Sequence, residues 1–219
     1  MTDRLENLSL NAETFIREGI IKGRYAFGER LSDRSLAAAM GISRTPVREA
    51  LSRLAAADLV VIRPQSGTFV VSLTSEMIRS VCAMRGVLEC GALRLAAGQD
   101  PERLAAAVSV PLAGGAIAIE EGDLTRAEAM DTAFHNALIA SANNPLLSRA
   151  YRSIIDYVEA IRHRLPRDIK RMQRAVHQHR RIVDLTLAGR LPDAEVELLS
   201  HVKIVEGISA TVIREKGSL

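Results

Sequence analysis

The sequence is poor in aromatic residues, since Phe, Tyr and Trp make up 3% of its 219 residues and Trp is absent. Sheets depend on aromatic and β-branched side chains, whereas the Ala, Leu and Arg that dominate here favour helices. No apolar run approaches the roughly 18 uncharged residues of a membrane-spanning helix, so we expect no integral membrane protein. The charged N-terminus has no signal-peptide core, which indicates a cytoplasmic protein.

Cysteine is also scarce. The two cysteines, Cys82 and Cys90, lie eight residues apart in one predicted helix, or about 12 Å along its axis. That separation is too long for a disulfide bond. A disulfide framework is therefore excluded, in agreement with a reducing compartment.

The chain has no strong excess of one charge: Lys and Arg exceed Asp and Glu by three. The charge is instead segregated. Residues 22–53 hold seven basic and three acidic residues, a net +4, and residues 149–181 hold ten and three, a net +7. Between them, residues 73–148 hold five basic and nine acidic residues, a net −4. A basic segment binds nucleic acid or forms a solvated helix face, and the charge pattern leaves both open.

Two short helices are predicted in the first seventy residues, over 33–40 and 44–57. Gly41 is placed to end the first of them in a left-handed conformation, and Ser43 to cap the second. Pro46 falls in the first turn of the second helix, where a missing N–H costs nothing. The spacing predicts a helix-turn-helix, with an ordinary helical hairpin as the alternative. A further helix over 9–22 precedes the pair, and Ser32 is placed to cap 33–40.

A two-stranded wing follows the helices. Residues 59–62 and 68–71 are β-type runs separated by a turn that contains Gly67. A recognition helix inserted in the major groove reads base edges with its first turn, which here carries Arg44, Thr45 and Arg48. Gly67 would let the backbone of the wing approach the DNA.

The run 31–54, with its core Ser-Arg-Thr-Pro-Val-Arg-Glu-Ala-Leu at 43–51, resembles the winged-helix domain of GntR-family bacterial transcription regulators. Ala57-Asp58 departs from the family pattern, which has a Gly there. The resemblance implies a homodimer that binds a near-palindromic double-stranded DNA operator in the bacterial nucleoid. It places the DNA contacts at Arg34, Ser43, Arg44, Thr45, Arg48 and Gly67.

Beyond residue 72 the pattern is wholly helical, and the loops are short enough for antiparallel neighbours in a bundle. Helices are expected over 75–97, 101–120, 123–142, 145–164, 166–188 and 193–213. The second is interrupted by Pro111 and by Gly114-Gly115. The predicted fold is mostly α: a winged helix-turn-helix domain over 1–72 and an antiparallel all-helical domain over 73–219.

Three histidines lie on apolar faces of the predicted bundle helices. Asp131 and His135 are four residues apart on one helix, so their side chains reach one point. His179 and His201 are equidistant from the turn centred on residue 190, which places them at one level of an antiparallel hairpin. One carboxylate and three imidazoles predict a site for Zn, Ni, Mn or a similar divalent ion, with open positions for a ligand. The alternative is that the histidines are hydrogen-bonded core residues.

The same four residues resemble the ligand-binding FCD domain of the FadR subfamily. In its metal-containing members, one Asp and three His hold a divalent ion, and a small carboxylate effector binds at or beside it. Arg85, in the run Arg-Gly-Val-Leu-Glu, is the candidate partner of the effector carboxylate, with a buried structural ion pair as the alternative. Asn143 is a candidate lining residue that would otherwise only end a helix before Pro145.

The sequence therefore predicts an effector-responsive transcription regulator, in the first instance a repressor, with no membrane partner and no catalytic residues. A metal-free regulator that binds a larger ligand is the first alternative. A metallo-hydrolase is the second, because an Asp/His3 site with open positions activates water. No general base is evident beside the site, and the N-terminal winged helix would then be unexplained. The basic stretch 149–181 has no assigned role.

Overall fold

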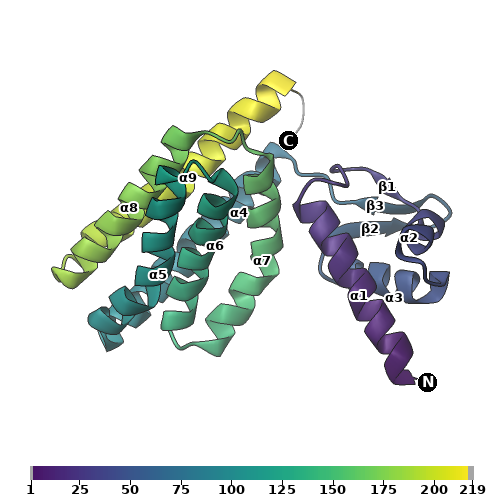
Figure 1. The fold of residues 1–219 in the computed structure, drawn as a ribbon, viewed down its shortest axis with the longest axis horizontal. Helices are drawn as coiled ribbons and strands as arrows, with labels where there is room; N and C mark the ends of the chain where they lie inside the picture. Colours follow the sequence, from purple (N-terminus) through teal and green to yellow (C-terminus); the bar gives the residue numbers. More distant parts are fainter. Residues whose placement is uncertain (1, 217–219) are drawn as a thin grey trace.

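The computed structural model describes the backbone of residues 2–216 and the side chains of residues 5–211. Figure 1 shows a helical bundle beside a smaller unit that contains a sheet. The smaller unit comprises α1 (Thr2–Ile21), β1 (Arg30–Leu31), α2 (Asp33–Met40), α3 (Arg44–Ala56), β2 (Val60–Arg63) and β3 (Gly67–Val70). The bundle comprises α4 (Ser75–Gln99), α5 (Pro101–Glu120), α6 (Leu124–Ser141), α7 (Pro145–Arg164), α8 (Ile169–Leu187) and α9 (Leu191–Lys216).

The smaller unit is a winged helix-turn-helix. Its antiparallel sheet has the order β1-β3-β2, with Val61 opposite Phe69 in the β2–β3 hairpin. The third strand, β1, was not predicted, because two residues are too few to show an alternating pattern. One face of α1 supplies Ala12, Ile16 and Ile20 to the core beneath α3, and all three are fully buried.

The helix boundaries of α2 and α3 follow from their end residues. Ser32 accepts a hydrogen bond from Ser35 N at 3.3 Å, and Gly41 ends α2 with a φ of 65°, both as predicted. Ser43 occupies the N-cap position of α3, but its side chain makes no capping hydrogen bond. The prediction of a Ser43 side-chain cap was therefore wrong, and the hydroxyl stays available to another partner.

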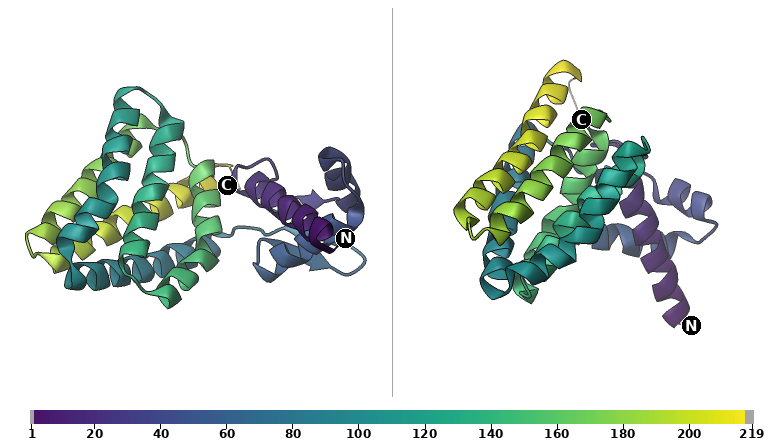
Figure 2. Two further views of the ribbon diagram at one scale, coloured as in Figure 1. Left: turned by 60° about the horizontal axis from the view of Figure 1, so that its bottom comes forward. Right: turned by 60° about the vertical axis from the view of Figure 1, so that its left-hand side comes forward.

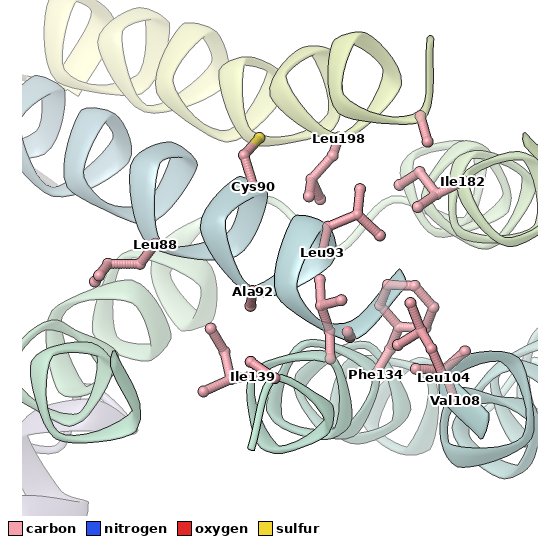
Figure 3. Packing of buried hydrophobic residues seen from close by; sticks show 14 of the residues in the cluster. Leu88, Cys90, Ala92, Leu93, Leu104, Val108, Phe134, Ile139, Ile182 and Leu198 are labelled. Carbon is pink, nitrogen blue, oxygen red and sulfur yellow. The ribbon is translucent and has the colours of Figure 1, made fainter. Parts of the chain in front are cut away.

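The bundle packs six helices around a core that Figure 3 shows at close range. Leu93 of α4, Phe134 of α6 and Leu198 of α9 are each almost fully buried in it. Cys82 and Cys90 are buried and unbonded, as their spacing requires, and burial raises the pKa of both thiols to about 11.

The predicted break in α5 does not occur: the helix runs through Pro111 and both glycines. A Cβ at Gly114 would lie 2.7 Å from Met130 Sδ, and one at Gly115 would lie 3.3 Å from Val176 Cγ2. The glycines thus permit close packing on α6 and α8. Pro111 is buried and loses one helical hydrogen bond, which the packing of the surrounding turns outweighs.

α5 also departs from the expectation about apolar runs. Within the described chain it is the one helix long and apolar enough, by length and composition, to cross a membrane. It contacts α4, α6 and α8, and its buried residues include Leu104 and Val108 of the bundle core. These contacts are those of a bundle helix.

Three other helices differ in extent from their predicted ranges. α1 begins at Thr2 rather than at 9, and α9 spans Leu191–Lys216 rather than 193–213. α8 begins at Ile169 rather than at 166, because Asp168 caps it by accepting from Lys170 N at 3.0 Å.

α7 is the bundle helix that packs against α1 of the small unit, as can be followed in Figures 1 and 2. The Arg164 guanidinium, at its C-terminal end, donates to the carbonyl oxygens of Ile20, Ile21 and Tyr25 at 2.8–3.2 Å. The Tyr157 hydroxyl donates to the Asp58 carbonyl oxygen at 2.5 Å. A further ion pair links Asp156 of α7 to Arg17 of α1.

Candidate DNA-binding surface and metal centre

The first turn of α3 is exposed on the small unit. Ser43, Arg44, Thr45 and Arg48 are all exposed at its N-terminal end. Three backbone N–H groups at a helix start have no intrahelical partner and attract anions such as phosphate. The predicted reading residues therefore lie together on one solvent-facing turn.

Asp33 of α2 holds two of these residues in place. Its carboxylate accepts from Arg44 Nη2 at 3.0 Å and from Arg48 Nε at 2.6 Å. Hydrogen bonds from Arg44 and Arg48 lower the pKa of Asp33. The two guanidinium groups are more than half exposed, so the pairs are readily exchanged for an outside anion.

A groove of about 540 Å³ runs between α3 and the wing. Arg48, Arg30 and Gly67 line it. Gly67 has a φ of +115°, and a Cβ there would lie 2.9 Å from Arg30 Nε. The glycine thus gives room to the side chain of Arg30, a contact that the sequence did not suggest.

Three further arginines complete this basic surface. Arg34 is exposed on α2 and makes no ion pair with the described residues. Arg30 precedes the helix-turn-helix, and Arg63 lies over the Phe69 ring at 5.0 Å. Sequence reasoning missed Arg30, because only the fold brings β1 to the groove beside Arg48.

The second candidate site lies inside the bundle. The ligand atoms of Asp131, His135, His179 and His201 all lie within 4.8 Å of one another. The three imidazoles are at most 5% exposed, and they come from α6, α8 and α9. The predicted convergence of four residues from three helices is thus present in the structure.

The ring nitrogens of these histidines face one another. His201 Nε2 lies 3.1 Å from His135 Nε2 and 3.4 Å from His179 Nε2. His179 Nε2 in turn lies 3.5 Å from Asp131 Oδ1. A tetrahedral ion with bonds of about 2.0–2.1 Å separates its ligands by about 3.3 Å, so these spacings suit a Zn-sized ion.

Acceptor atoms lie near the Nδ1 of two of these rings. Glu89 Oε2 lies 3.0 Å from His135 Nδ1, although the pair is not aligned as a full hydrogen bond. Gln178 Oε1 lies 3.3 Å from His201 Nδ1. A proton on Nδ1 of His135 and of His201 would face these acceptors and leave each Nε2 with a lone pair for a metal ion.

This arrangement fits a divalent cation. His135 Nε2 and His201 Nε2 face each other at 3.1 Å. Asp131 Oδ1 is buried and has no hydrogen-bond partner among the described residues. Burial lowers the pKa of all three histidines, which keeps them neutral, as metal ligands must be.

Arg85 of α4 lies against the same cluster and is 1% exposed. Its Nε donates to Glu89 Oε1 at 2.7 Å, and its Nη2 lies 2.7 Å from His135 Nε2. Tyr151 donates its hydroxyl to Glu89 Oε1 at 3.0 Å. Burial alone would raise the pKa of Glu89, but Arg85 and His135 hold it well below its usual range.

Comparison with known proteins identifies the two units. Residues 80–203, more than half of the chain, match the FCD domain. Residues 8–70 match the family described as bacterial regulatory proteins, gntR family. The chain belongs to the GntR family. It is a transcription regulator with an FCD domain, and its relatives are not enzymes. GntR-family regulators bind DNA operators.

Several known regulators are similar to this GntR-family chain over nearly its whole length. A Paenarthrobacter nicotinovorans protein named "Probable D-xylose utilization operon transcriptional repressor" is 34% identical over 86% of this chain and 82% of its own. The Escherichia coli repressor RspR is 27% identical over 93% and 89%. A solved GntR regulator from Rhodococcus sp. RHA1 superposes with a TM-score of 0.76 at 26% identity, covering 91% of this chain and 95% of that one.

Not every predicted residue of this GntR-family regulator reaches the bundle site. Asn143 is exposed in the turn after α6, with a φ of +48°, and lies about 12 Å beyond His135 along the helix. It therefore belongs to the helix terminus, and its assignment to the effector pocket was wrong. His177 faces solvent, as its spacing from His179 requires.

The structure adds residues that the sequence did not single out. Arg162 of α7 is 7% exposed and forms an ion pair with Asp131. Arg171 of α8 is 8% exposed and lies 3.4 Å from Glu128. Both belong to the basic stretch 149–181, in which the sequence does not distinguish buried from exposed arginines. Gln178 and Glu89 had a local signal, because Gln178 adjoins His179 and Glu89 follows Arg85 by one helical turn.

Proposed function

We propose that this chain is a homodimeric, cytoplasmic repressor of the FadR subfamily, whose affinity for its operator is controlled by a small organic acid. The effector binds at or near a divalent metal ion, Zn, Ni or Mn, held by Asp131, His135, His179 and His201. The winged helices of the two protomers bind a near-palindromic operator whose half-sites lie about one helical turn apart. The DNA contacts come from Arg34, Ser43, Arg44, Thr45, Arg48 and Gly67.

One observation carries the metal assignment: the 3.1 Å contact between His135 Nε2 and His201 Nε2, each with an acceptor at its Nδ1. Asp131 Oδ1 beside these rings is buried without a hydrogen-bond partner among the described residues, and a cation at the centre of the cluster would remove that cost of about 1–3 kcal/mol. An ion bound there would fix the three helices that supply its ligands, and it would polarise an effector carboxylate.

α7 supports a route from this site to the DNA. Arg162 reaches Asp131 in the bundle, and two residues later Arg164 donates to three carbonyl oxygens of the small unit. An effector that displaces Arg162 would therefore shift the helix on which the small unit rests. Control requires that the effector bind the two arrangements with different affinity.

A thermal melt of metal-stripped protein with Zn, Ni or Mn tests the metal site. A ligand that binds only the folded chain at a thousand times its Kd stabilises it by about 4 kcal/mol. For a chain of this size we expect a rise of about 8–16 °C in Tm. His179→Ala should abolish the rise. His177→Ala, two residues away on the exposed side of α8, is the matched control and should keep it.

A metal-independent Tm in the wild type would overturn the metal assignment and favour the metal-free regulator with a larger ligand. The control of DNA binding is tested separately, by fluorescence anisotropy on the DNA upstream of the gene. Asp131→Ala should abolish the response to organic acids but keep basal DNA binding. Loss of DNA binding with an unchanged effector affinity would contradict the division of roles between the two units.

A further inference from the structure

The basic stretch 149–181 contains two arginines that are not on a solvated face. Arg162 and Arg171 are 7% and 8% exposed, and they line a cavity with the metal-ligand candidates Asp131 and His201. The other basic residues of this stretch are exposed, except Arg164, which binds the small unit. A buried guanidinium needs an anionic partner, so these two call for a specific explanation.

The buried arginines are incompletely paired. Arg162 Nη1, Arg171 Nε and Arg85 Nη1 are buried and have no hydrogen-bond partner in the described part of the chain. An arginine side chain stays charged at neutral pH, so each of these groups is a buried cation. Three donors thus surround the site without acceptors.

The charges of the site balance only without a metal. Each buried arginine has one carboxylate partner: Arg85 has Glu89, Arg162 has Asp131 and Arg171 has Glu128. Glu128 is shared with Arg167, so it offers no spare negative charge. Histidines that hold a metal ion bind it through unprotonated ring nitrogens, so they add no charge. A divalent ion therefore adds two positive charges to a neutral buried cluster, and a stable complex needs two negative charges from outside.

The open space lies on both sides of Arg162. The inner cavity, of about 20 Å³, is lined by Asp131, Arg162, Arg171 and His201 and has room for one small polar group. The outer cavity, of about 330 Å³, is lined by Arg162, His163 and Thr132, by Lys22 from the small unit, and by the acidic residues Glu128 and Glu159. That volume holds the body of a small organic acid.

From these observations we infer that the effector is a dianion, a small dicarboxylate. One carboxylate binds the metal ion beside Arg85, and the second binds Arg162, with Arg171 behind it. Arg85 and Arg162 belong to different helices, and each contacts a different candidate metal ligand, His135 and Asp131 respectively. Their unpaired Nη1 groups therefore suit two separated anionic groups better than one compact dianion. This inference rests on the metal site proposed above.

Calorimetric titration of metal-loaded protein tests it with matched probes. Succinate and glutarate are each compared with their monomethyl esters, which keep the size but lose one charge. Inorganic phosphate serves as a compact dianion. We expect at least one dicarboxylate to bind at least about tenfold more tightly than its monoester and than phosphate, because each charge-assisted contact contributes about that factor.

Variants locate the second carboxylate. Arg162→Gln should reduce the ratio between a dicarboxylate and its monoester to near one, and Arg162→Lys should retain part of it. Arg171→Gln should lower it less. Arg152→Gln, on an exposed position of the same helix, is the matched control and should leave it unchanged. The wild-type comparison needs no variant, so a folding defect in Arg162→Gln does not remove the test.

Direct titration with metal distinguishes a failure of the proposed metal site from a failure of the dianion inference. If the metal binds but every dicarboxylate equals its monoester, or no acid binds, the dianion inference is wrong and the metal site stands. If phosphate equals the dicarboxylates, or Arg162→Gln keeps the full preference, the second carboxylate is not at Arg162. If no metal binds, both proposals are wrong.

Discussion

The two functional regions of this regulator use the same chemistry, arginine paired with carboxylate, in opposite environments. On the small unit, Arg44 and Arg48 share Asp33 at a surface where both guanidinium groups are more than half exposed. In the bundle, Arg85 and Glu89 pair with side chains that are at most 1% exposed. Exposed pairs contribute little stability and exchange partners easily, whereas buried charges require complete pairing.

The difference explains how one chain serves two roles. A DNA-binding surface must give up its internal partners to phosphate, so its ion pairs have to be weak. The effector site proposed for the bundle would have to respond to one ligand, and a buried cluster with unpaired donors suits that role because a donor that a ligand leaves unpaired stays desolvated. The predictions below test this contrast in order of decreasing effect.

The largest effect concerns the acid stability of the metal-free protein. Burial lowers the folded-state pKa of His135, His179 and His201 below the value of about 6.5 expected in the unfolded chain. The unfolded chain therefore takes up protons first as the pH falls. Stability is fully present above about pH 6.5 and is lost as the pH falls toward the folded-state pKa values, by up to about 4 kcal/mol per pH unit for three groups.

Urea unfolding between pH 5.5 and 7.5 measures this slope. His201→Gln should flatten it by about a third, and His177→Gln, at an exposed position, should not change it. A stability independent of pH over this range would show that the buried histidines are not neutral in the folded chain. Bound metal should keep or steepen the slope, since it holds the folded-state rings deprotonated while the unfolded chain still takes up protons.

Removing one partner of the buried pair should be the next largest effect. Glu89→Ala leaves Arg85 as an uncompensated buried charge and removes the acceptor facing His135 Nδ1. We expect a loss of about 3–5 kcal/mol in the free energy of unfolding, measured with urea. Tyr151→Phe removes one hydrogen bond to the same carboxylate and should cost about 1 kcal/mol. Equal effects of the two variants would contradict the picture of a charge-dependent core.

The arginines of α3 should affect DNA binding without affecting the fold. Arg44→Ala and Arg48→Ala should each weaken operator binding by about 1–3 kcal/mol if they read bases. If they contact phosphate, each should reduce the slope of log affinity against log salt by about one. Anisotropy titrations at several salt concentrations measure both quantities. Normal binding by both variants would show that α3 is not the recognition helix.

The smallest effect on stability is expected at Asp33. Asp33→Asn removes both exposed ion pairs, and the free energy of unfolding should change by less than about 0.5 kcal/mol. The same substitution should strengthen DNA binding, because Arg44 and Arg48 lose their internal competitor. A stability loss comparable to that of Glu89→Ala would contradict the conclusion that exposed ion pairs contribute less to stability than buried ones.

Local signals predicted most elements. The Ser32 cap and the left-handed Gly41 set the ends of α2, and the turn at Gly67 separates the strands of the wing. The continuous α5 was predicted wrongly at Pro111 and Gly114, because a helix breaker is overridden when neighbouring helices need small residues for close contact. β1 was missed because its pairing with β3 is long-range.

The clustering of the four candidate metal ligands was predictable because helical periodicity places Asp131 with His135, and because His179 and His201 are symmetric about one turn. Their partners were not: Arg162 looks like any other member of a basic run until the fold buries it against Asp131. The sequence by itself determined which residues form each helix face, since that follows from periodicity. Only the tertiary structure decided which charges are buried together, because the solvation of a side chain depends on contacts between distant segments.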